Sequence, residues 1–530
     1  MEDPKQQGVL GEQPARDQDH LHREGKDDPS RVMASEDAQI DVERRTSKPE
    51  PSDLEAPVVT EETTSSSPIP YSIFTPVQKA LIVAVVSFAA TFTGFASNIY
   101  FPVIPTIALD LGVSSELINL SVTSYMIFQG LSPTVWGAIA DAQGRRLTYI
   151  FCFIVFFGAC VGLAETKHYY QLVILRCVQS TGSASTVAIG AGVIGDITKR
   201  EERGGYMGYF QAGLLVPLAI GPVLGGVFAG TLGWRAIFWF LTIYSGVFLM
   251  ILIVVLPETL RSMVGNGSVP ARGVSKSPLS RIMEKRHPEM VSTESLPNQK
   301  RAPINFLGPL QILCGREVVF IVVFVSLYYT IWQMTVTVMS SLFASVYGLG
   351  DIEIGLTYIA NGVGTVLGTL TTGKFLDFEY GRAKRSHTGA PEDFPLERAR
   401  LRSMWITAGI QCVSVLIFGW TLQYRVHIAV PIVCSFFLGY TAVSIYSAGS
   451  TFLVDVFPNQ AASATAAVNL VRCLMGAGGT AAVLPISNAI GVGRAFTLFT
   501  GLMIAGLGFL VVQLRHGARW RRELEKKLHE

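Results

Sequence analysis

Two arginines occur inside long apolar stretches of this sequence, where a charged side chain needs a chemical reason to be. Arg176 lies in LVILRCVQSTGSAS, and Gln179 follows three residues later, on nearly the same face of a helix. Arg472 lies in NLVRCLMGAGG. A guanidinium inside an apolar helix is costly unless it faces a cavity or a partner. We therefore predict that Arg176 faces a central cavity, where it binds an anionic group or takes part in proton coupling.

Both arginines also have a plainer interpretation. Arg176 would be held by neighbouring carbonyl groups, and Arg472 would face the cytoplasmic end of its helix instead of a cavity. Other polar and aromatic residues in the apolar runs would line the same cavity or cross-link helices. They are Asn98, Tyr125, Gln129, Gln211, Trp332, Gln333, Asn361, Tyr440 and Tyr446. As a group they indicate an amphipathic cavity with aromatic walls.

Carboxylates are absent from the middle of the apolar runs. Proton-coupled carriers often use a buried acid whose pKa is raised by desolvation. The residues themselves therefore give no independent support for proton coupling.

The apolar runs that carry these residues determine the fold class. The chain has 530 residues, of which 49% are hydrophobic and 15% charged, whereas a soluble chain has about a quarter charged residues. A bilayer core of ~30 Å needs about 20 helical residues. Twelve runs are long enough, beginning near Leu81, Ile118, Leu147, Tyr170, Met207, Ile237, Val318, Gly355, Ser403, Ile428, Ala464 and Ala495. We predict an all-α integral membrane protein with twelve transmembrane helices in two pseudo-symmetric six-helix bundles.

Composition divides the chain into five parts. Residues 1–70 contain 8 Lys and Arg against 17 Asp and Glu, and we predict a disordered acidic cytoplasmic tail. Residues 79–257 and 317–514 would form the two six-helix halves. Residues 258–316 are rich in Pro, Ser and basic residues and would be the cytoplasmic linker. Residues 515–530 form a basic cytoplasmic tail, whose arginines would touch anionic headgroups or merely flank the last span.

Loop charges predict the orientation in the membrane. The loops that would face the cytoplasm contain many more Lys and Arg residues than those that would face outside. This asymmetry predicts that both termini are cytoplasmic in a multi-pass membrane protein.

A polar turn separates the second and third apolar runs, with the sequence GAIADAQGRR. Its glycines would permit a tight turn between packed helices, and its arginines would keep the turn on the cytoplasmic side. A related sequence, GKFLDFEYGR, follows the second run of the other half. The marked residues are Gly137, Asp141, Gly144, Arg145 and Arg146 in the first copy and Gly373, Asp377, Gly381 and Arg382 in the second. Such a repeat predicts two related halves with matching turns on one side of the bilayer.

The spacing Gly-x-x-x-Asp-x-x-Gly-Arg-Arg resembles the loop between spans two and three of the major facilitator superfamily. The resemblance implies that Asp196 pairs with Arg145 and helps to hold an outward-open state. The run GPVLGG in span five is similar to the motif that marks antiporters of this superfamily, although Pro217 stands where that motif has a glycine. Its small residues and proline would let a helix bend and pack without a leak. The motif residues are Gly221, Pro222, Gly225 and Gly226.

Several longer stretches resemble the fungal branch of twelve-span drug:proton antiporters, which includes quinidine-resistance-type pumps and the citrate exporter of filamentous fungi. They are Ser97–Ile107, Thr123–Gly130, Gly192–Gly204, Ile237–Ile243 and Leu256–Arg261. The resemblance implies a plasma-membrane monomer that exports a drug-like compound or secondary metabolite by proton antiport with alternating access. Its partners would be a small-molecule substrate, protons and the lipid bilayer, with no nucleic acid.

Two alternatives remain at this point. One is an exporter of an organic acid such as citrate, which the two arginines motivate. The other is a transporter-like nutrient sensor that signals through residues 1–70. An enzyme is disfavoured, because the sequence shows no nucleophile–base set, no metal-ligand pattern and no Walker-type loop. We therefore expect no cofactor and no metal.

Overall fold

A computed structural model describes residues 71–269, 271, 275–278, 308–313, 315–387, 394–457 and 461–529. The chain separates into two units, Met1–Ser67 and Pro68–Glu530, and everything below concerns the second. The predicted tail, residues 1–70, lies outside the described residues, as does much of the predicted linker. The described residues form helices and connecting segments, without β-strands.

Twelve long helices run through the described residues, and each begins within two turns of a predicted start. They are α1 (Pro76–Asn98), α3 (Ser115–Gln143), α4 (Arg145–Ala164), α5 (Tyr169–Ile197), α6 (Arg200–Leu232), α7 (Arg235–Val255), α11 (Arg316–Tyr347), α12 (Asp351–Ser386), α14 (Met404–Gln423), α15 (Ala429–Val456), α16 (Ala461–Ile490) and α17 (Val492–His529). Ten of the twelve helices lie in segments apolar enough to cross a bilayer on their own. The other two, α3 and α12, are long enough but more polar.

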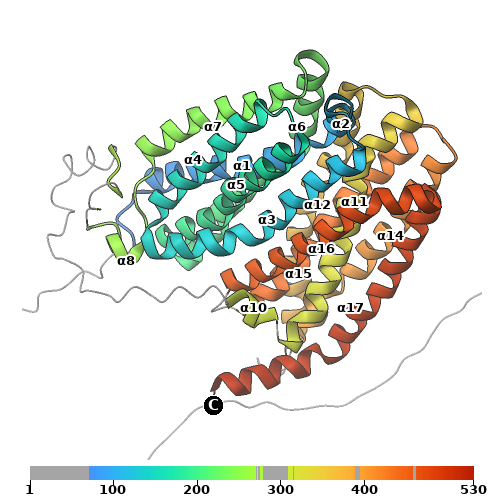
Figure 1. The fold of residues 1–530 in the computed structure, drawn as a ribbon. Helices are drawn as coiled ribbons and strands as arrows, with labels where there is room; N and C mark the ends of the chain where they lie inside the picture. Colours follow the sequence, from blue (N-terminus) through green and yellow to red (C-terminus); the bar gives the residue numbers. More distant parts are fainter. Residues whose placement is uncertain are drawn as a thin grey trace, which may run out of the picture. The chain divides into compact units, whose positions relative to one another are not determined.

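Shorter elements complete the described part of the chain. They are η1 (Phe101–Val103), α2 (Ile104–Leu111), α8 (Arg261–Val264), α10 (Gly308–Leu313) and α13 (Leu396–Leu401). Figure 1 shows the first six long helices, coloured blue to green, beside the second six, coloured yellow to red. We call the end with the α3–α4 turn the near end of the bundle, and the end with α2 the far end.

Local sequence explains where the helices start and stop. Thr75 accepts a hydrogen bond from the backbone N–H of Gln78 and so caps α1, and Pro76 occupies the first turn, where its missing N–H costs nothing. Gly144 has φ +109°, which side-chain-bearing residues rarely adopt, and this residue ends α3 one position before α4 begins. A Cβ at Gly144 would also lie 2.5 Å from the carboxylate of Glu258. The tight turn therefore requires glycine both for its positive φ and for its lack of a side chain.

The matching turn predicted at residues 373–382 is wrong. These residues lie inside α12, which continues to Ser386, so Gly373, Asp377 and Arg382 are helical. Neither Gly373 nor Gly381 adopts positive φ. The apolar residues of KFLDF sustain the helical pattern past the point where α3 stops. The repeat in the sequence therefore marks related positions but not related turns.

The two six-helix halves meet along two pairs of helices, α6 with α12 and α3 with α16. Glycines make the first pair close: Gly362 leaves no room for a Cβ beside Ala219, and Gly226 lies directly against the backbone of Asp351. Within the first half, Gly225 packs against the carbonyl of Ile99. The GPVLGG run is thus a packing surface between helices, as small residues in membrane helices commonly are.

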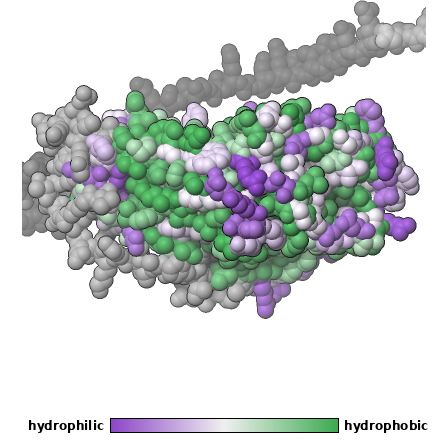
Figure 2. All heavy atoms as spheres, turned by 45° about the horizontal axis from the view of Figure 1, so that its top comes forward, coloured by the Kyte–Doolittle hydropathy of each residue, from purple (hydrophilic) through white to green (hydrophobic). Residues whose placement is uncertain are grey.

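Large apolar side chains cover much of the outer surface of the bundle. Ile243 and Val247 on α7 are 65% and 59% exposed, and similar residues occur on most other long helices. Figure 2 shows a largely hydrophobic face interrupted by patches of hydrophilic side chains. Exposed apolar surface of this extent belongs in a bilayer.

Candidate functional site

Arg176 of α5 lies in the interior of the first half and is 1% exposed. Its Nη1 donates to the carbonyl of Ala96 at 2.8 Å and to Oε1 of Gln179 at 2.7 Å. The rings of Tyr100 and Tyr125 each lie 4.3 Å from its guanidinium carbon. Among the described residues no carboxylate forms an ion pair with Arg176, and its Nε has no hydrogen-bond partner. The charge is therefore surrounded by neutral groups alone.

Arg472 of α16 has a similar environment in the second half. Its Nη2 donates to Oδ1 of Asn469 at 2.6 Å, and the rings of Tyr329 and Tyr446 lie 4.4 and 5.0 Å from its guanidinium carbon. Its Nε also has no hydrogen-bond partner in the described part of the chain. Each half thus holds one guanidinium between two tyrosine rings.

Helix α3 connects the two arginine sites. Tyr125 of α3 packs on Arg176, and the carbonyl of Gln129, one turn later, accepts a hydrogen bond from Asn469 at 3.4 Å. One helical turn is about 5.4 Å along the axis. Because Asn469 in turn holds Arg472, the two sites lie against neighbouring turns of one helix.

Two residues of α11 extend the second site. The ring of Trp332 lies 5.3 Å from that of Tyr329, and Oε1 of Gln333 accepts a hydrogen bond from the Tyr329 hydroxyl at 3.3 Å. The Nε1 of Trp332 is buried without a partner among the described residues. The structure thus brings Trp332, Gln333 and Tyr446 together around the Arg472 site.

Four predicted cavity residues make other contacts. Asn98 donates to the carbonyl of Gly94 in its own helix, and Gln211 is exposed. Asn361 packs against Gly439, and the hydroxyl of Tyr440 accepts from Thr371, so both join α12 to α15. The cross-linking interpretation fits Asn361 and Tyr440 in this conformation.

The tyrosines Tyr100 and Tyr329 were not among the predicted residues. Each supplies a ring to one of the buried arginines. The sequence does contain a feature that points to them. A buried cation without an acidic partner favours the faces of aromatic rings, and both tyrosines lie in aromatic-rich segments.

At the near end of the first half, Arg145 lies between two acids. Its Nη1 is 2.6 Å from Oδ1 of Asp141, and its Nε is 3.1 Å from Oδ2 of Asp196. The guanidinium lies on Gly192 of α5, where a Cβ would come within 2.7 Å of it. The structure therefore places Arg145 and Asp196 together, as the resemblance implied. Arg146 instead donates to the carbonyl of Leu256 at 2.9 Å, where α7 ends.

Glu258 is a component of this end that the sequence did not reveal. Its carboxylate accepts hydrogen bonds from the backbone N–H groups of Arg145 at 2.8 Å and Arg146 at 3.3 Å, the first residues of α4. The N–H groups of Thr259 and Leu260 donate to it as well, each at 3.0 Å. A carboxylate at a helix N-terminus is favoured by the helix dipole. Glu258 is 4% exposed, and it thereby fastens the segment after α7 to the α3–α4 turn.

The second half has its own near-end cluster around Arg400 of α13. The Nε of Arg400 is 2.8 Å from Oδ2 of Asp455, its Nη1 is 3.9 Å from Oδ1 of Asp377, and its guanidinium lies over the ring of Tyr380. Helices α12 and α15 occupy the positions in this half that α3 and α5 occupy in the first. Arg400 therefore occupies the position that corresponds to Arg145, whereas Arg382, the predicted counterpart, is exposed.

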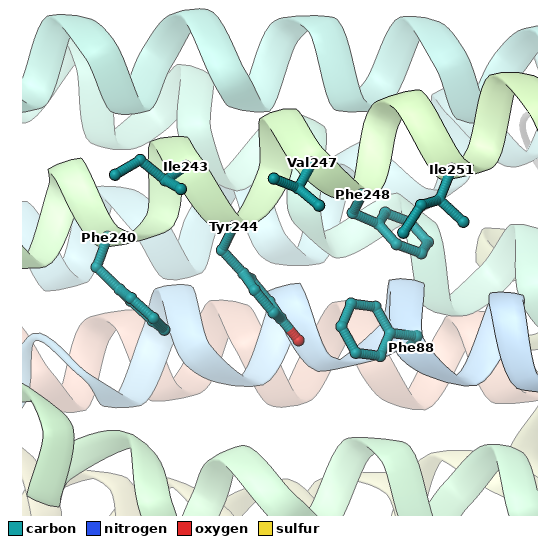
Figure 3. A pocket seen from close by; sticks show the side chains of 7 residues that line it. All are labelled: Phe88, Phe240, Ile243, Tyr244, Val247, Phe248 and Ile251. Atoms are coloured by element: carbon teal, nitrogen blue, oxygen red, sulfur yellow. The ribbon is translucent and has the colours of Figure 1, made fainter.

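An apolar groove lies between α1 and α7, and Figure 3 shows its lining. The lining residues are Phe88, Phe240, Ile243, Tyr244, Val247, Phe248 and Ile251. The one polar group shown there, the Tyr244 hydroxyl, is already hydrogen-bonded to Thr91 at 2.9 Å. The groove opens on the exposed face of α7 and fits a surface that faces lipid.

Twelve long helices in two halves, most of them apolar, with an arginine inside each half, are typical of a membrane transporter. Residues 86–480 match the family described as Major Facilitator Superfamily. The chain is 39% identical to Citrate exporter 1 of Aspergillus niger, over 92% of this chain and 94% of that protein. It is 33% identical to the multidrug transporter QDR2 of Candida glabrata, over 84% and 82% of the two chains. The chain belongs to the major facilitator superfamily.

Solved structures agree on the fold. The crystal structure of a D-xylose–proton symporter gives a TM-score of 0.60 at 14% identity, covering 81% of this chain and 96% of that one. A bacterial homolog of the human lysosomal transporter Spinster gives 0.57 at 12% identity, covering 86% and 99%. The predicted all-α membrane fold and family are therefore confirmed, the twelve predicted spans are consistent with the ten candidate spans found among the described residues, and the chain is a multi-pass membrane transporter rather than an enzyme.

Proposed function

We propose that this transporter exports a small organic anion, a di- or tricarboxylate such as citrate, from the cytoplasm across the plasma membrane. One observation carries the proposal. Arg176 and Arg472 come from opposite halves, lie against neighbouring turns of α3, and have only neutral partners among the described residues.

The energetics favour an anion between the two sites. A cation–π contact stabilises a buried guanidinium by about 0.5–2 kcal/mol, whereas moving an ion out of water costs several kcal/mol. Two nearby positive charges also repel each other in a medium of low dielectric constant. A carboxylate can accept two parallel hydrogen bonds from a guanidinium, so a cargo with two or more carboxylates would satisfy both sites at once.

The relatives are consistent with this cargo. The relative that is 39% identical is named a citrate exporter. The drug-like or secondary-metabolite cargo is a second candidate, favoured by a different observation. The rings of Tyr100, Tyr125, Tyr329 and Trp332 gather around the same two sites, and they would take the flat face of an apolar molecule. Of two relatives at 33% identity, one is named a multidrug transporter and the other an MFS antiporter.

Two energy sources are compatible with export. Proton antiport is the one that the family resemblance implies. The membrane potential is the other, because each negative charge leaving a cytoplasm at −100 mV gains about 2.3 kcal/mol. A cargo of two or three negative charges would need no proton, and no Asp or Glu occurs in the middle of a span. Collapsing the pH gradient and the potential separately in vesicles distinguishes the two. Antiport is wrong if flux follows the potential alone.

We also propose that the near end faces the cytoplasm, since its loops contain most of the basic residues. Side-chain hydrogen bonds join the two halves at the far end, where Thr106 donates to Asp351 and Asn488 donates to Glu116, each at 2.7 Å. This distribution suits a carrier that is closed to the outside and open to the cytoplasm. The Arg145–Asp196 pair is formed in this conformation. We infer that this pair holds α4 against α5 here.

Counterflow into proteoliposomes tests the cargo. Radiolabelled citrate and a neutral dye would be offered to the wild-type chain and to Arg176→Gln and Arg472→Gln. Arg235→Gln is the matched control, because Arg235 is a half-exposed arginine paired with Asp110 at the far end. We expect both interior substitutions to abolish citrate flux, and the control to retain it. Unchanged citrate flux in Arg176→Gln would refute the carboxylate proposal, and dye flux without citrate flux in the wild type would favour the drug-like cargo.

Two further parts of the proposal rest on the family. We propose a monomer as the working unit, which light scattering in detergent would check. The nutrient-sensor alternative depends on residues 1–70, outside the described residues. Deleting this tail would abolish signalling and spare flux if the chain were a sensor.

A further inference from the structure

The last helix is much longer than a membrane requires. Helix α17 has 38 residues, which corresponds to about 57 Å against a bilayer core of about 30 Å. The sequence suggested two uses for its basic end, contact with anionic headgroups or a plain flank. Arg521 fits neither use, because its side chain is 10% exposed and faces protein.

Arg521 is held by two groups of the segment before α14. Its Nε is 3.2 Å from Oε1 of Glu397, whose side chain is 3% exposed, and its Nη2 donates to the carbonyl of Phe394 at 2.9 Å. One turn earlier, Gly517 lets α17 approach α13, since a Cβ there would lie 3.0 Å from Cγ of Glu397. Trp520 stacks on Phe320 of α11 with ring centroids 5.4 Å apart. The extension of α17 is therefore built into the protein.

The partner of Arg521 lies on the same short helix as the near-end arginine of this half. Glu397 and Arg400 are three residues apart in the six-residue helix α13. Their side chains bind different helices. Arg400 binds Asp455 of α15 and approaches Asp377 of α12. Contacts thus run without a break from α17 through α13 to α12 and α15.

The first half has a comparable contact near the end of its own sixth helix, α7. The segment after α7 supplies Glu258, which binds the N-terminus of α4 beside Arg145. The C-terminal part of α17 itself supplies Arg521, which binds α13 beside Arg400. In each half, the end of the sixth helix or the segment directly after it contacts the arginine cluster at the near end.

We propose that the C-terminal extension of α17 is the positioning element of the near-end cluster in the second half, and that it acts through the Arg521–Glu397 pair on Arg400. The inference rests on the proposed function only in that the near end must open and close during transport. With the pair broken, α13 loses its attachment to α17, and Arg400 no longer holds α12 and α15 in fixed positions. The exchange between states changes, whereas the interior arginines are left intact.

The test uses the full chain in proteoliposomes with Arg521→Gln, Glu397→Gln and the charge swap Arg521→Glu with Glu397→Arg. Arg519→Gln is the matched control, because Arg519 lies on the same helix in a solvent-exposed pair with Glu523. Two readouts are measured, the citrate Vmax and KM, and the maleimide labelling rate of a cysteine introduced by Tyr209→Cys, an exposed site near the start of α6.

We expect each single substitution to lower Vmax by about fivefold or more at unchanged KM, and to change the labelling rate by a similar factor. The charge swap should restore at least half of both, and Arg519→Gln should resemble the wild type. A changed KM, an equal effect of Arg519→Gln, or a swap that restores folding but neither readout would overturn the inference. If the wild type moves no citrate but labelling still responds to Arg521→Gln, the cargo proposal fails and this inference stands.

Discussion

Each half of the transporter places arginines in two contrasting environments. In the interior, Arg176 and Arg472 lie between tyrosine rings with amide and carbonyl partners. At the near end, Arg145 and Arg400 lie between carboxylates of neighbouring helices. Fixed carboxylates neutralise a guanidinium permanently and so serve to hold helices together. Rings and amides solvate it without neutralising it, and our proposal is that a cargo supplies the missing negative charge.

The two near ends differ from each other as well. In the first half a carboxylate, Glu258, collects four backbone N–H groups, whereas in the second an arginine, Arg521, pairs with a buried side chain. Two of these N–H groups form the first turn of α4 and are fixed by that helix, whereas a pair of side chains can separate by a change of rotamer. We therefore expect the first half to be the more rigid frame and the second to be the more adjustable one.

Glu258→Ala should have the largest effect on stability. The substitution leaves four buried N–H groups without an acceptor, and at about 1 kcal/mol or more each the loss is about 4 kcal/mol. Thermal unfolding in detergent measures it, with the exposed Glu165→Ala as the control. A melting temperature equal to that of the wild type would contradict the expectation that the first half is the more rigid one.

Arg176→Gln should lower the rate of carboxylate export by about 100-fold, since two charge-assisted hydrogen bonds to the cargo are worth about 3 kcal/mol. The same substitution should leave thermal stability unchanged or raise it, because it removes a buried charge that has no counter-ion among the described residues. Export kinetics and unfolding would be measured on one preparation. A large loss of stability would show that this arginine serves packing.

Arg400→Gln should lower stability and leave binding of the cargo unchanged, the opposite of what we expect for Arg176→Gln. It removes the partner of Asp455, and we expect a loss of about 2 kcal/mol of unfolding free energy, with the affinity for the cargo unchanged. The KM of the folded fraction, compared with that of Arg176→Gln, separates the two environments. Equal effects of Arg176→Gln and Arg400→Gln on both readouts would mean that the two kinds of site are not distinct.

Gly362→Ala should weaken only the conformation described here. The added methyl group clashes with Ala219 across the α6–α12 contact, at a cost of about 1–3 kcal/mol. The substitution should shift the population toward states in which these helices separate. Gly373→Ala, on the same helix but with open space around it, is the control. Maleimide labelling of a cysteine introduced by Thr106→Cys at the far end would report the shift.

The smallest effect is expected at Glu202, which accepts a hydrogen bond from Lys79 at 2.6 Å at the near end. This hydrogen bond lowers the pKa of the Glu202 carboxyl from its ordinary value of 4.5. Its stabilising contribution is present above the unfolded pKa and disappears only as the pH falls through the lower folded value. Glu202→Gln should therefore leave the dependence of stability on pH between 5 and 8 unchanged, and a difference there would contradict the assignment.

The sequence predicted the parts of the fold that depend on local pattern. Hydropathy located all twelve long helices, and Gly144 marked a real turn because its conformation requires glycine. The pair of Arg145 with Asp196 followed from a family pattern. Arg400 could not be found this way, because α12 extends beyond the repeat and the arginine arrives on a separate short helix.

The rings around the interior arginines also depended on packing. Arg176 and Tyr125 lie on different helices, and their separation in the sequence does not predict that they are in contact. Glu258 was hidden for a related reason, since its four partners are backbone atoms, which have no signature in the sequence. Contacts between segments therefore could be predicted only where a family pattern names both residues, whereas residues that shape their own segment could be recognised directly.

The contact between Asn469 and the carbonyl of Gln129 has a consequence for release. Among the described residues, the partners of Arg176 belong to the first half and those of Arg472 to the second, and the hydrogen bond from Asn469 to Gln129 links the two sites. When the halves rotate, the sites part as intact units. A cargo bound by both arginines would then keep its contacts with only one of them. This loss of contacts would itself promote release of the anion.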